Sequence, residues 1–220
     1  MDAAAYIAEA IGTFALVFAG AGSVCADASG AEVGLLGIAF AHGLIILAMI
    51  ATLGVISGGH FNPAVTLALF STRRIPMARA LGYVAAQLTG AALAAFLLSF
   101  LFPALAQSPH LGVCRISGVT PLGGFLLETI ASFLFMLIIF AGSVDPRTPR
   151  ALAPLIIGLG LTALICSIGF FTGAALNPAR AFGPALAAGL WQNHWIYWAG
   201  PCGGALGAAL FYDGFLLRKP

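Results

Sequence analysis

Six long apolar runs dominate the pattern of hydrophobic and polar positions along the chain. A helix needs about 20 mostly apolar residues to cross a bilayer, and backbone groups in lipid must form hydrogen bonds within their own segment. Each run therefore predicts one membrane helix. The runs cover residues 5–24, 33–54, 80–102, 122–144, 151–171 and 195–217.

Two shorter apolar segments remain, at residues 61–70 and 176–188. A helix of about ten residues extends about 15 Å, which is half of a hydrocarbon core about 30 Å thick. Each segment follows a glycine-rich stretch, 57–60 or 172–175, which suits backbone that dips into the membrane and returns. Such backbone is tolerated where it is buried in protein or lines a wet cavity. We therefore expect an all-α integral membrane protein with six transmembrane helices and two re-entrant half-helices.

The composition excludes a soluble protein. Hydrophobic residues make up 61% of the 220 residues and charged residues 7%, whereas soluble domains carry about 25% charged residues. So little charge cannot cover a surface in water, and the surrounding solvent must be lipid. The net charge of +2 gives no indication of a nucleic-acid partner. No basic residue precedes the first run and no cleavage site is evident, so that run is expected to be retained as a span.

The basic residues orient the predicted helices. They gather between runs two and three, between runs four and five, and after run six, and these places share one side only if six helices separate them. The positive-inside rule makes that side cytoplasmic. We expect a multi-pass protein of the cell membrane with both termini cytoplasmic. Seven of the nine basic residues lie at these places, while Arg115 lies in a predicted outer loop and Arg180 within a short apolar segment. The seven are Arg73, Arg74, Arg79, Arg147, Arg150, Arg218 and Lys219.

The chain contains an internal repeat. Glu9-Ala-Ile-Gly-Thr-Phe is matched by Glu128-Thr-Ile-Ala-Ser-Phe, and Asn62-Pro63-Ala64 is matched by Asn177-Pro178-Ala179. Each half holds three long runs and one short segment, and because three is odd, the halves have opposite orientations. Inverted repeats with helices broken near the midplane are typical of transport proteins. We expect one membrane channel domain, residues 1–220, made of repeats at about 1–105 and 122–220.

Each Asn-Pro-Ala copy opens a short helix, since Asn is favoured as N-cap and Pro at the first helical position. A single copy would be an ordinary helix start, but two copies at matching places of an inverted repeat indicate the centre of a pore. There two helix N-termini, each carrying about +0.5 of an elementary charge, would repel cations. The amides of Asn62 and Asn177 are expected to donate to a passing water. That water's hydrogens then point away, which interrupts a chain of proton transfer.

These motifs resemble the aquaporin, or major intrinsic protein, family. The resemblance covers nearly the whole chain and implies the hourglass fold, a homotetramer with one pore per chain, and no cofactor. The matching strings are Ser57-Gly-Gly-His-Phe-Asn-Pro-Ala-Val-Thr66, Thr172-Gly-Ala-Ala-Leu-Asn-Pro-Ala-Arg-Ala-Phe-Gly-Pro184, the paired glutamates, Ala86-Gln87 and Tyr197-Trp198-Ala199-Gly200-Pro201.

The resemblance also points to a selectivity filter. Arg180 lies three residues after the second Asn, and a buried arginine within a membrane usually marks a pathway. By resemblance it belongs to the family's narrow filter, whose other positions align on His42, Ile165 and Ala174. This set looks like the filters of some plant vacuolar-type aquaporins and differs from the Phe/His/Cys/Arg of strict animal water channels. Glycerol facilitators usually pair two aromatic residues with Arg and have Asp where this chain has Ala181.

Glu9 and Glu128 lie early in runs one and four, and buried carboxylates must find partners. The re-entrant loops leave backbone N–H groups unpaired, so each glutamate is predicted to anchor one loop. Inverted symmetry would hold the two acids apart, which argues against a catalytic pair. His60 is predicted to be structural and to bond the re-entrant backbone. His110, in an outer loop, is either a vestibule residue or a solvated side chain.

The sequence thus predicts a passive channel for water, with ammonia or another very small neutral solute as a second candidate, that excludes protons and ions. The alternative is a facilitator of larger neutral solutes such as glycerol. No enzymatic activity is expected, because no nucleophile with an oriented base is found. Expected partners are water, small neutral solutes, membrane lipid and further copies of the chain, without nucleic acid. The cysteines show no metal-ligand spacing, so no metal site is expected, and a Cys25–Cys114 disulfide stays open.

Overall fold

The computed structural model describes residues 3–217, and the predicted apolar segments are its helices. Run four ends in a π-helical turn that continues α5, and run six ends in a similar turn that continues α8. The long helices are α1 (Ala3–Ala26), α2 (Gly34–Ser57), α4 (Met77–Leu101), α5 (Pro121–Ile139) with η4 (Phe140–Val144), α6 (Ala153–Thr172), and α8 (Ile196–Phe211) with η6 (Tyr212–Leu216). The half-helices are α3 (Pro63–Ser71) and α7 (Pro178–Ala188).

The long helices make the chain a multi-pass membrane protein. Within residues 3–217, five of them, α1, α2, α4, α5 with η4, and α6, are long and apolar enough to cross a membrane. The sixth, α8, has 16 residues, but η6 continues it and it packs against α5. The fold is therefore the expected one, with six membrane helices and two half-helices.

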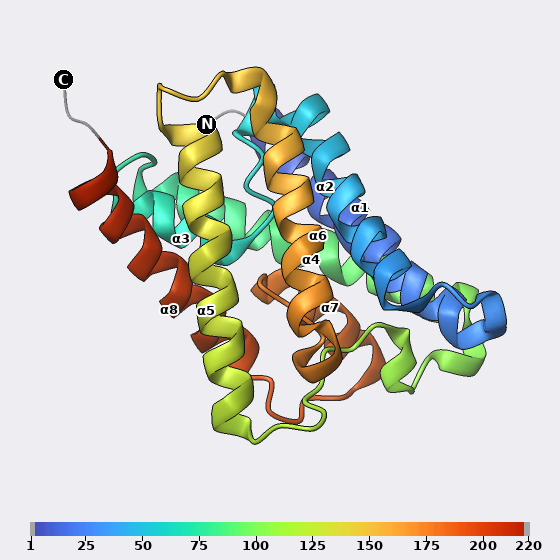
Figure 1. The fold of residues 1–220 in the computed structure, drawn as a ribbon. Coiled ribbons are helices and arrows are strands. Elements are labelled where there is room, and N and C mark those ends of the chain that lie inside the picture. Colours follow the sequence, from blue (N-terminus) through green and yellow to red (C-terminus); the bar gives the residue numbers. More distant parts are fainter. Residues whose placement is uncertain (1–2, 218–220) are drawn as a thin grey trace.

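The two halves of the chain are built alike. α1 packs against α2 and α4, and α5 packs in the same way against α6 and α8. The two three-helix units meet where α2 contacts α6, and the half-helices lie between the units (Figure 1). Each half-helix packs mainly against the other half of the chain, α3 against α8 and α7 against α4. Neither half could therefore form its part of the centre alone.

Glycine allows close helix contacts at two equivalent places of the repeat. A Cβ atom on Gly90 of α4 would lie 2.1 Å from the carbonyl oxygen of Ala10 in α1. A Cβ atom on Gly204 of α8 would lie 2.1 Å from the carbonyl oxygen of Thr129 in α5. Any side chain at these positions would separate the helices, so the small residues of α4 and α8 serve close packing.

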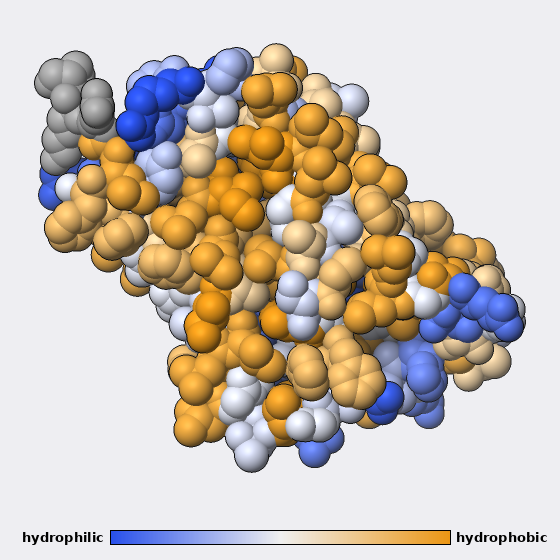
Figure 2. Space-filling view, viewed as in Figure 1, coloured by the Kyte–Doolittle hydropathy of each residue, from blue (hydrophilic) through white to orange (hydrophobic). Residues whose placement is uncertain are grey.

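The surface is that of a protein in lipid. The face in Figure 2 is largely hydrophobic, and hydrophilic residues gather at its two ends. Large apolar side chains stand free of the core, among them Val55, which is 88% exposed, and Phe100, which is 80% exposed. Lipid tails are the solvent that such side chains require.

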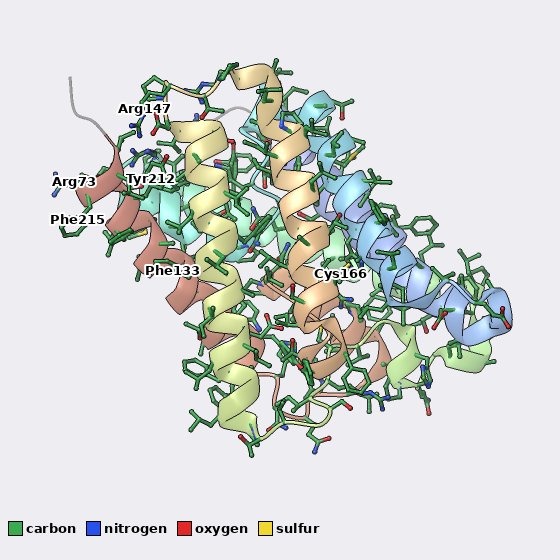
Figure 3. The ribbon with its side chains drawn as sticks, in the orientation of Figure 1. Arg73, Phe133, Arg147, Cys166, Tyr212 and Phe215 are labelled. Carbon is green, nitrogen blue, oxygen red and sulfur yellow. The ribbon has the colours of Figure 1, made fainter. Side chains whose placement is uncertain are left out.

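Polar contacts join three segments at one end of the molecule, where Figure 3 shows Arg147 and Tyr212. Arg74, in the loop after α3, donates from Nη2 to Asp213 Oδ1 of η6 at 2.7 Å. Arg147, in the loop after η4, pairs with the buried Asp145, to which the Tyr212 hydroxyl also donates at 2.9 Å.

These contacts place the basic loops after α3 and after η4 on the same side of the molecule, as the sequence predicts. Arg218 and Lys219, which were assigned to the same side, lie outside the described residues.

Asp145 gives this end of the molecule a pH-dependent stability. Hydrogen bonds from Arg147 hold the pKa of Asp145 below its ordinary value of 3.8. A depressed carboxyl pKa stabilises the folded state above the unfolded value and loses that effect as the pH falls through the folded value. The melting temperature of Asp145→Asn should therefore be lower than that of the wild type at pH 7, and the difference should shrink below pH 3.8. Asp27→Asn, at the other end, is the control, and a difference that stays constant with pH would contradict the assignment.

Candidate functional site

The two half-helices begin with the same capping arrangement. Asn62 Oδ1 accepts a hydrogen bond from the backbone N–H of Ala64 at 2.9 Å. Asn177 Oδ1 accepts equivalent bonds from the N–H groups of Ala179 at 2.9 Å and Arg180 at 3.3 Å. Pro63 and Pro178 occupy the first helical positions of α3 and α7. A backbone N–H at this position would have no partner within the helix, so proline, which lacks one, loses no hydrogen bond there.

The same asparagines also tie the two halves together. Asn62 Nδ2 donates to the carbonyl of Leu176 at 2.9 Å, and Asn177 Nδ2 donates to the carbonyl of Phe61 at 2.8 Å. A carboxamide nitrogen carries two hydrogens, so each asparagine keeps one further donor. Both asparagines line the same cavity. The centre of the molecule therefore presents two fixed N–H donors side by side.

Glu9 holds the first re-entrant loop. Its carboxylate is fully buried and accepts from the backbone N–H groups of His60 at 2.9 Å and Phe61 at 2.7 Å. Ser57 Oγ donates to it at 2.6 Å and Gln87 Nε2 at 2.8 Å. Two backbone donors and two side-chain donors thus satisfy a carboxylate that would otherwise be very unfavourable inside a membrane protein.

Glu128 holds the second loop in the same way. It accepts from the backbone N–H groups of Ala175 and Leu176, each at 2.9 Å, and from Thr172 Oγ1 at 2.7 Å. Two tyrosines complete the symmetry at the ends of the preceding helices, because Tyr83 donates to the carbonyl of Ser57 and Tyr197 to the carbonyl of Thr172. The sequence analysis assigned no hydrogen-bonding role to these tyrosines or to the hydroxyl groups of Ser57 and Thr172. Their matching places in the repeat are the signal that could have identified them.

The loops need such anchors because their backbones are strained. Phe61 and Leu176, each just before an Asn-Pro-Ala sequence, have φ values of +47° and +49°. A residue other than glycine held at positive φ costs about 1–3 kcal/mol. Hydrogen bonds from these residues' N–H groups to Glu9 and Glu128 offset that cost. Each glutamate therefore stabilises a loop shape that the local sequence alone would not adopt.

One detail of the expected anchoring differs. The ring of His60 was expected to bond the re-entrant backbone, but among the described residues its Nδ1 lies 3.1 Å from Thr66 Oγ1 in α3 and its ring packs edge-on against Tyr83. Only the backbone N–H of His60 takes part in the loop anchor, through Glu9. The Thr66 hydroxyl of the half-helix, in place of a loop carbonyl, is therefore the partner of the imidazole.

Two cavities meet inside the protein. The inner cavity, of about 280 Å³, runs from Arg74 and Ile75 at one end to Arg180 at the other. The outer cavity, of about 250 Å³, includes His110 and Arg115 of the loop between α4 and α5. Both cavities are lined by Ile165 and Arg180, which therefore mark the junction between them. His42 and Ala174 also line the inner cavity, so the four aligned residues all face the same cavity.

The outer loop orients Arg180. Its Nη1 donates to the carbonyl of Gly112 at 2.7 Å and lies 2.9 Å from Cys114 Sγ. Burial raises the pKa of the Cys114 thiol, and the nearby Arg180 guanidinium lowers it by less, so the pKa is about 11. The sulfur is therefore a neutral thiol at pH 7. Among the described residues, Arg180 Nε is buried without a protein partner. No signal in the sequence linked this loop to Arg180.

The described cysteines settle the question of the disulfide that the sequence left open. In residues 3–217, Cys25 and Cys114 are free thiols, and Cys25 Sγ contacts the carbonyl of His110. Over the same residues, His, Cys, Asp and Glu form no group that could hold a metal ion.

A membrane protein whose two half-helices meet end to end beside a cavity that opens into a second one has the architecture of a channel. Comparison with known families agrees, because the family described as Major intrinsic protein matches residues 2–212. The chain therefore belongs to the major intrinsic protein family.

Individual relatives cover nearly the whole chain. Aquaporin TIP4-4 of Zea mays is 45% identical over 222 residues, which are 98% of this chain and 87% of the relative. Probable aquaporin TIP3-2 of Arabidopsis thaliana is 43% identical over 223 residues, covering 95% of this chain and 82% of the relative. The X-ray structure of the aquaglyceroporin from Plasmodium falciparum matches 98% of this chain and 97% of its own, with a TM-score of 0.88. At 24% identity, that likeness shows the fold alone.

Proposed function

We propose that this chain is a passive channel for water that also passes ammonia and excludes protons and ions. One observation carries the proposal: Asn62 and Asn177 lie side by side on the cavity wall, each with one amide hydrogen bonded to the opposite loop and one left over. Membership of the family and relatives named as aquaporins support it.

The asparagine pair accounts for both passage and proton exclusion. A water oxygen that accepts from both amides has its own hydrogens directed away from the pair, so it cannot accept a proton from the next water. The N-termini of α3 and α7 add positive potential at the same place, which opposes cations. The polar groups here serve binding and positioning, and we propose no enzymatic reaction for them and no cofactor.

We propose that His42, Ile165, Ala174 and Arg180 form the selectivity filter. Arg180 supplies fixed donors and a positive charge, whereas Ile165 and Ala174 supply an aliphatic wall. This set lacks the pair of aromatic residues that glycerol facilitators usually place beside the arginine. Facilitation of larger neutral solutes is therefore the less supported alternative.

We further propose that the chain is one channel domain of inverted repeats, in the cell membrane with both termini cytoplasmic, and that four copies assemble with one pore each. The basic loops brought together by Arg74 and Arg147 support this orientation. A fluorescent tag on either terminus, imaged in cells and probed with a quencher that cannot cross membranes, would test both the membrane and the side.

Purified protein in liposomes should speed osmotic shrinkage in a stopped-flow experiment, relative to empty liposomes of the same lipid. The decay of a pH gradient, measured with the membrane potential clamped, should be unchanged. Ammonia entry, followed as internal alkalinisation, should be faster than in empty vesicles. If correctly folded protein left shrinkage unchanged, the water-channel assignment would be wrong, and faster decay of the pH gradient would contradict proton exclusion.

A further inference from the structure

The imidazole of His42 packs into a space that exists only because residue 20 is glycine. Gly20 is buried in α1, which packs against α2. A Cβ atom on Gly20 would lie 2.3 Å from His42 Nε2, 2.4 Å from Cδ2 and 2.7 Å from Cε1. These distances are shorter than any non-bonded carbon contact. Every other residue at position 20 would therefore displace the ring or separate the two helices.

The ring is held at its other nitrogen by its own helix. His42 Nδ1 lies 2.8 Å from the carbonyl oxygen of Ile38, one turn earlier in α2. A carbonyl can only accept, so Nδ1 carries the hydrogen, and Nε2 of the neutral ring is an acceptor. Among the described residues, Nε2 has no protein partner. Contact with α1 at Gly20, with no hydrogen bond, therefore fixes this edge of the ring.

The open space next to the ring is the channel. His42 lines the inner cavity together with Arg180 and Ile165, which also line the outer cavity. A ring pushed away from α1 while Nδ1 stays bonded to Ile38 would turn toward that cavity, which is the open space it lines. The constriction would then narrow, although none of its four lining residues had changed.

We propose that Gly20 is a positioning residue of the constriction, which sets how far the His42 ring is withdrawn from the path of the solute. Its influence on transport rests on the proposed water-channel function, but its influence on the ring does not. Gly20 lies in α1, outside the four positions aligned with the family filter.

The same helix offers a matched control. A Cβ atom on Gly22 would have Leu98 Cδ2 at 3.5 Å as its nearest neighbour, which is an ordinary contact. Gly20→Ala and Gly22→Ala make the same chemical change two residues apart and remove one flexible residue each from α1. The two variants differ because only the methyl group added at position 20 would clash with the His42 ring.

The experiment compares wild type, Gly20→Ala, Gly22→Ala, His42→Ala and Gly20→Ala/His42→Ala in liposomes, each checked for yield and melting temperature. Gly20→Ala should lower water permeability severalfold, and Gly22→Ala should leave it unchanged. In the His42→Ala background no ring remains to be displaced, so adding Gly20→Ala should have no further effect. An equal fractional loss in both backgrounds would overturn the proposal.

A structure of Gly20→Ala provides a readout that does not depend on transport. The His42 ring should be turned toward the inner cavity with α1 and α2 at their original separation. A ring in its original position, or helices moved apart around an unmoved ring, would overturn the proposal. Absence of water conduction by the wild type would instead contradict the proposed function, and the ring position would still decide the role of Gly20.

Discussion

Replacing Glu9 or Glu128 by alanine should lower the yield of folded protein, its melting temperature and its water permeability together. Each glutamate accepts from two backbone N–H groups of a strained loop, and both are fully buried. A buried donor left without a partner costs about 1–3 kcal/mol, so the two orphaned N–H groups should cost about 2–6 kcal/mol. Domain stabilities are only about 5–15 kcal/mol, so the effect should be large.

Conservative variants separate the loss of the acceptor from the loss of volume. Glu9→Gln keeps the size of the side chain but turns an NH₂ group toward some of the donors, so it should be less stable than the wild type and more stable than Glu9→Ala. The exposed Glu32 supplies the matched control, since Glu32→Gln should change none of the three measurements. A Glu9 or Glu128 variant with normal yield and melting temperature that had lost only conduction would contradict the anchoring role.

Truncating the constriction should admit larger solutes. His42→Ala and Arg180→Ala each remove a side chain that lines the inner cavity, so glycerol and urea fluxes should rise severalfold in liposomes containing either variant. Arg180→Ala should also weaken the exclusion of cations, because it removes the fixed positive charge at the junction of the cavities. The measurements are stopped-flow light scattering with each solute and ion flux under a clamped potential.

Two further variants separate charge from position at this site. Arg180→Lys keeps the charge but loses the planar fork that reaches Gly112 and Cys114. It should still exclude cations while admitting more glycerol than the wild type. Arg115→Ala removes the same charge from the outer cavity away from the junction and should leave glycerol exclusion intact. If neither His42→Ala nor Arg180→Ala altered any flux in well-folded protein, these residues would not line the constriction.

Much of the fold could be predicted because lipid leaves the chain few choices. A backbone in hydrocarbon must satisfy its hydrogen bonds within each segment, so run length alone indicates helices. The predicted run at 33–54 is α2, Gly34–Ser57, and the predicted half-helix at 176–188 is α7, Pro178–Ala188. Asn-Pro-Ala predicts a helix start from local sequence alone, since Asn caps the helix and Pro occupies its first position.

The residues of the candidate site could be predicted mainly where they occur at matching positions of the internal repeat. Paired glutamates and paired asparagines stand at matching places, and a repeat marks them without any knowledge of contacts. The loops that the glutamates hold were predicted from the need of a buried carboxylate for donors, but the protein partners of the asparagines and of Arg180 were not. The bond from Asn62 to Leu176 spans 114 positions along the chain, and the bond from Arg180 to Gly112 spans 68.

Hydrophobic patterning and local capping thus determined the helices, their approximate ends and the two helix starts that face each other. Those properties depend on neighbours in the chain and on the solvent. Three features arise only when distant segments pack together. They are the packing of α3 on α8 and of α7 on α4, the loop contact that holds Arg180, and the contact of His42 with Gly20. Contacts between distant segments depend on the shapes of all the surfaces that meet, and no local pattern encodes those shapes.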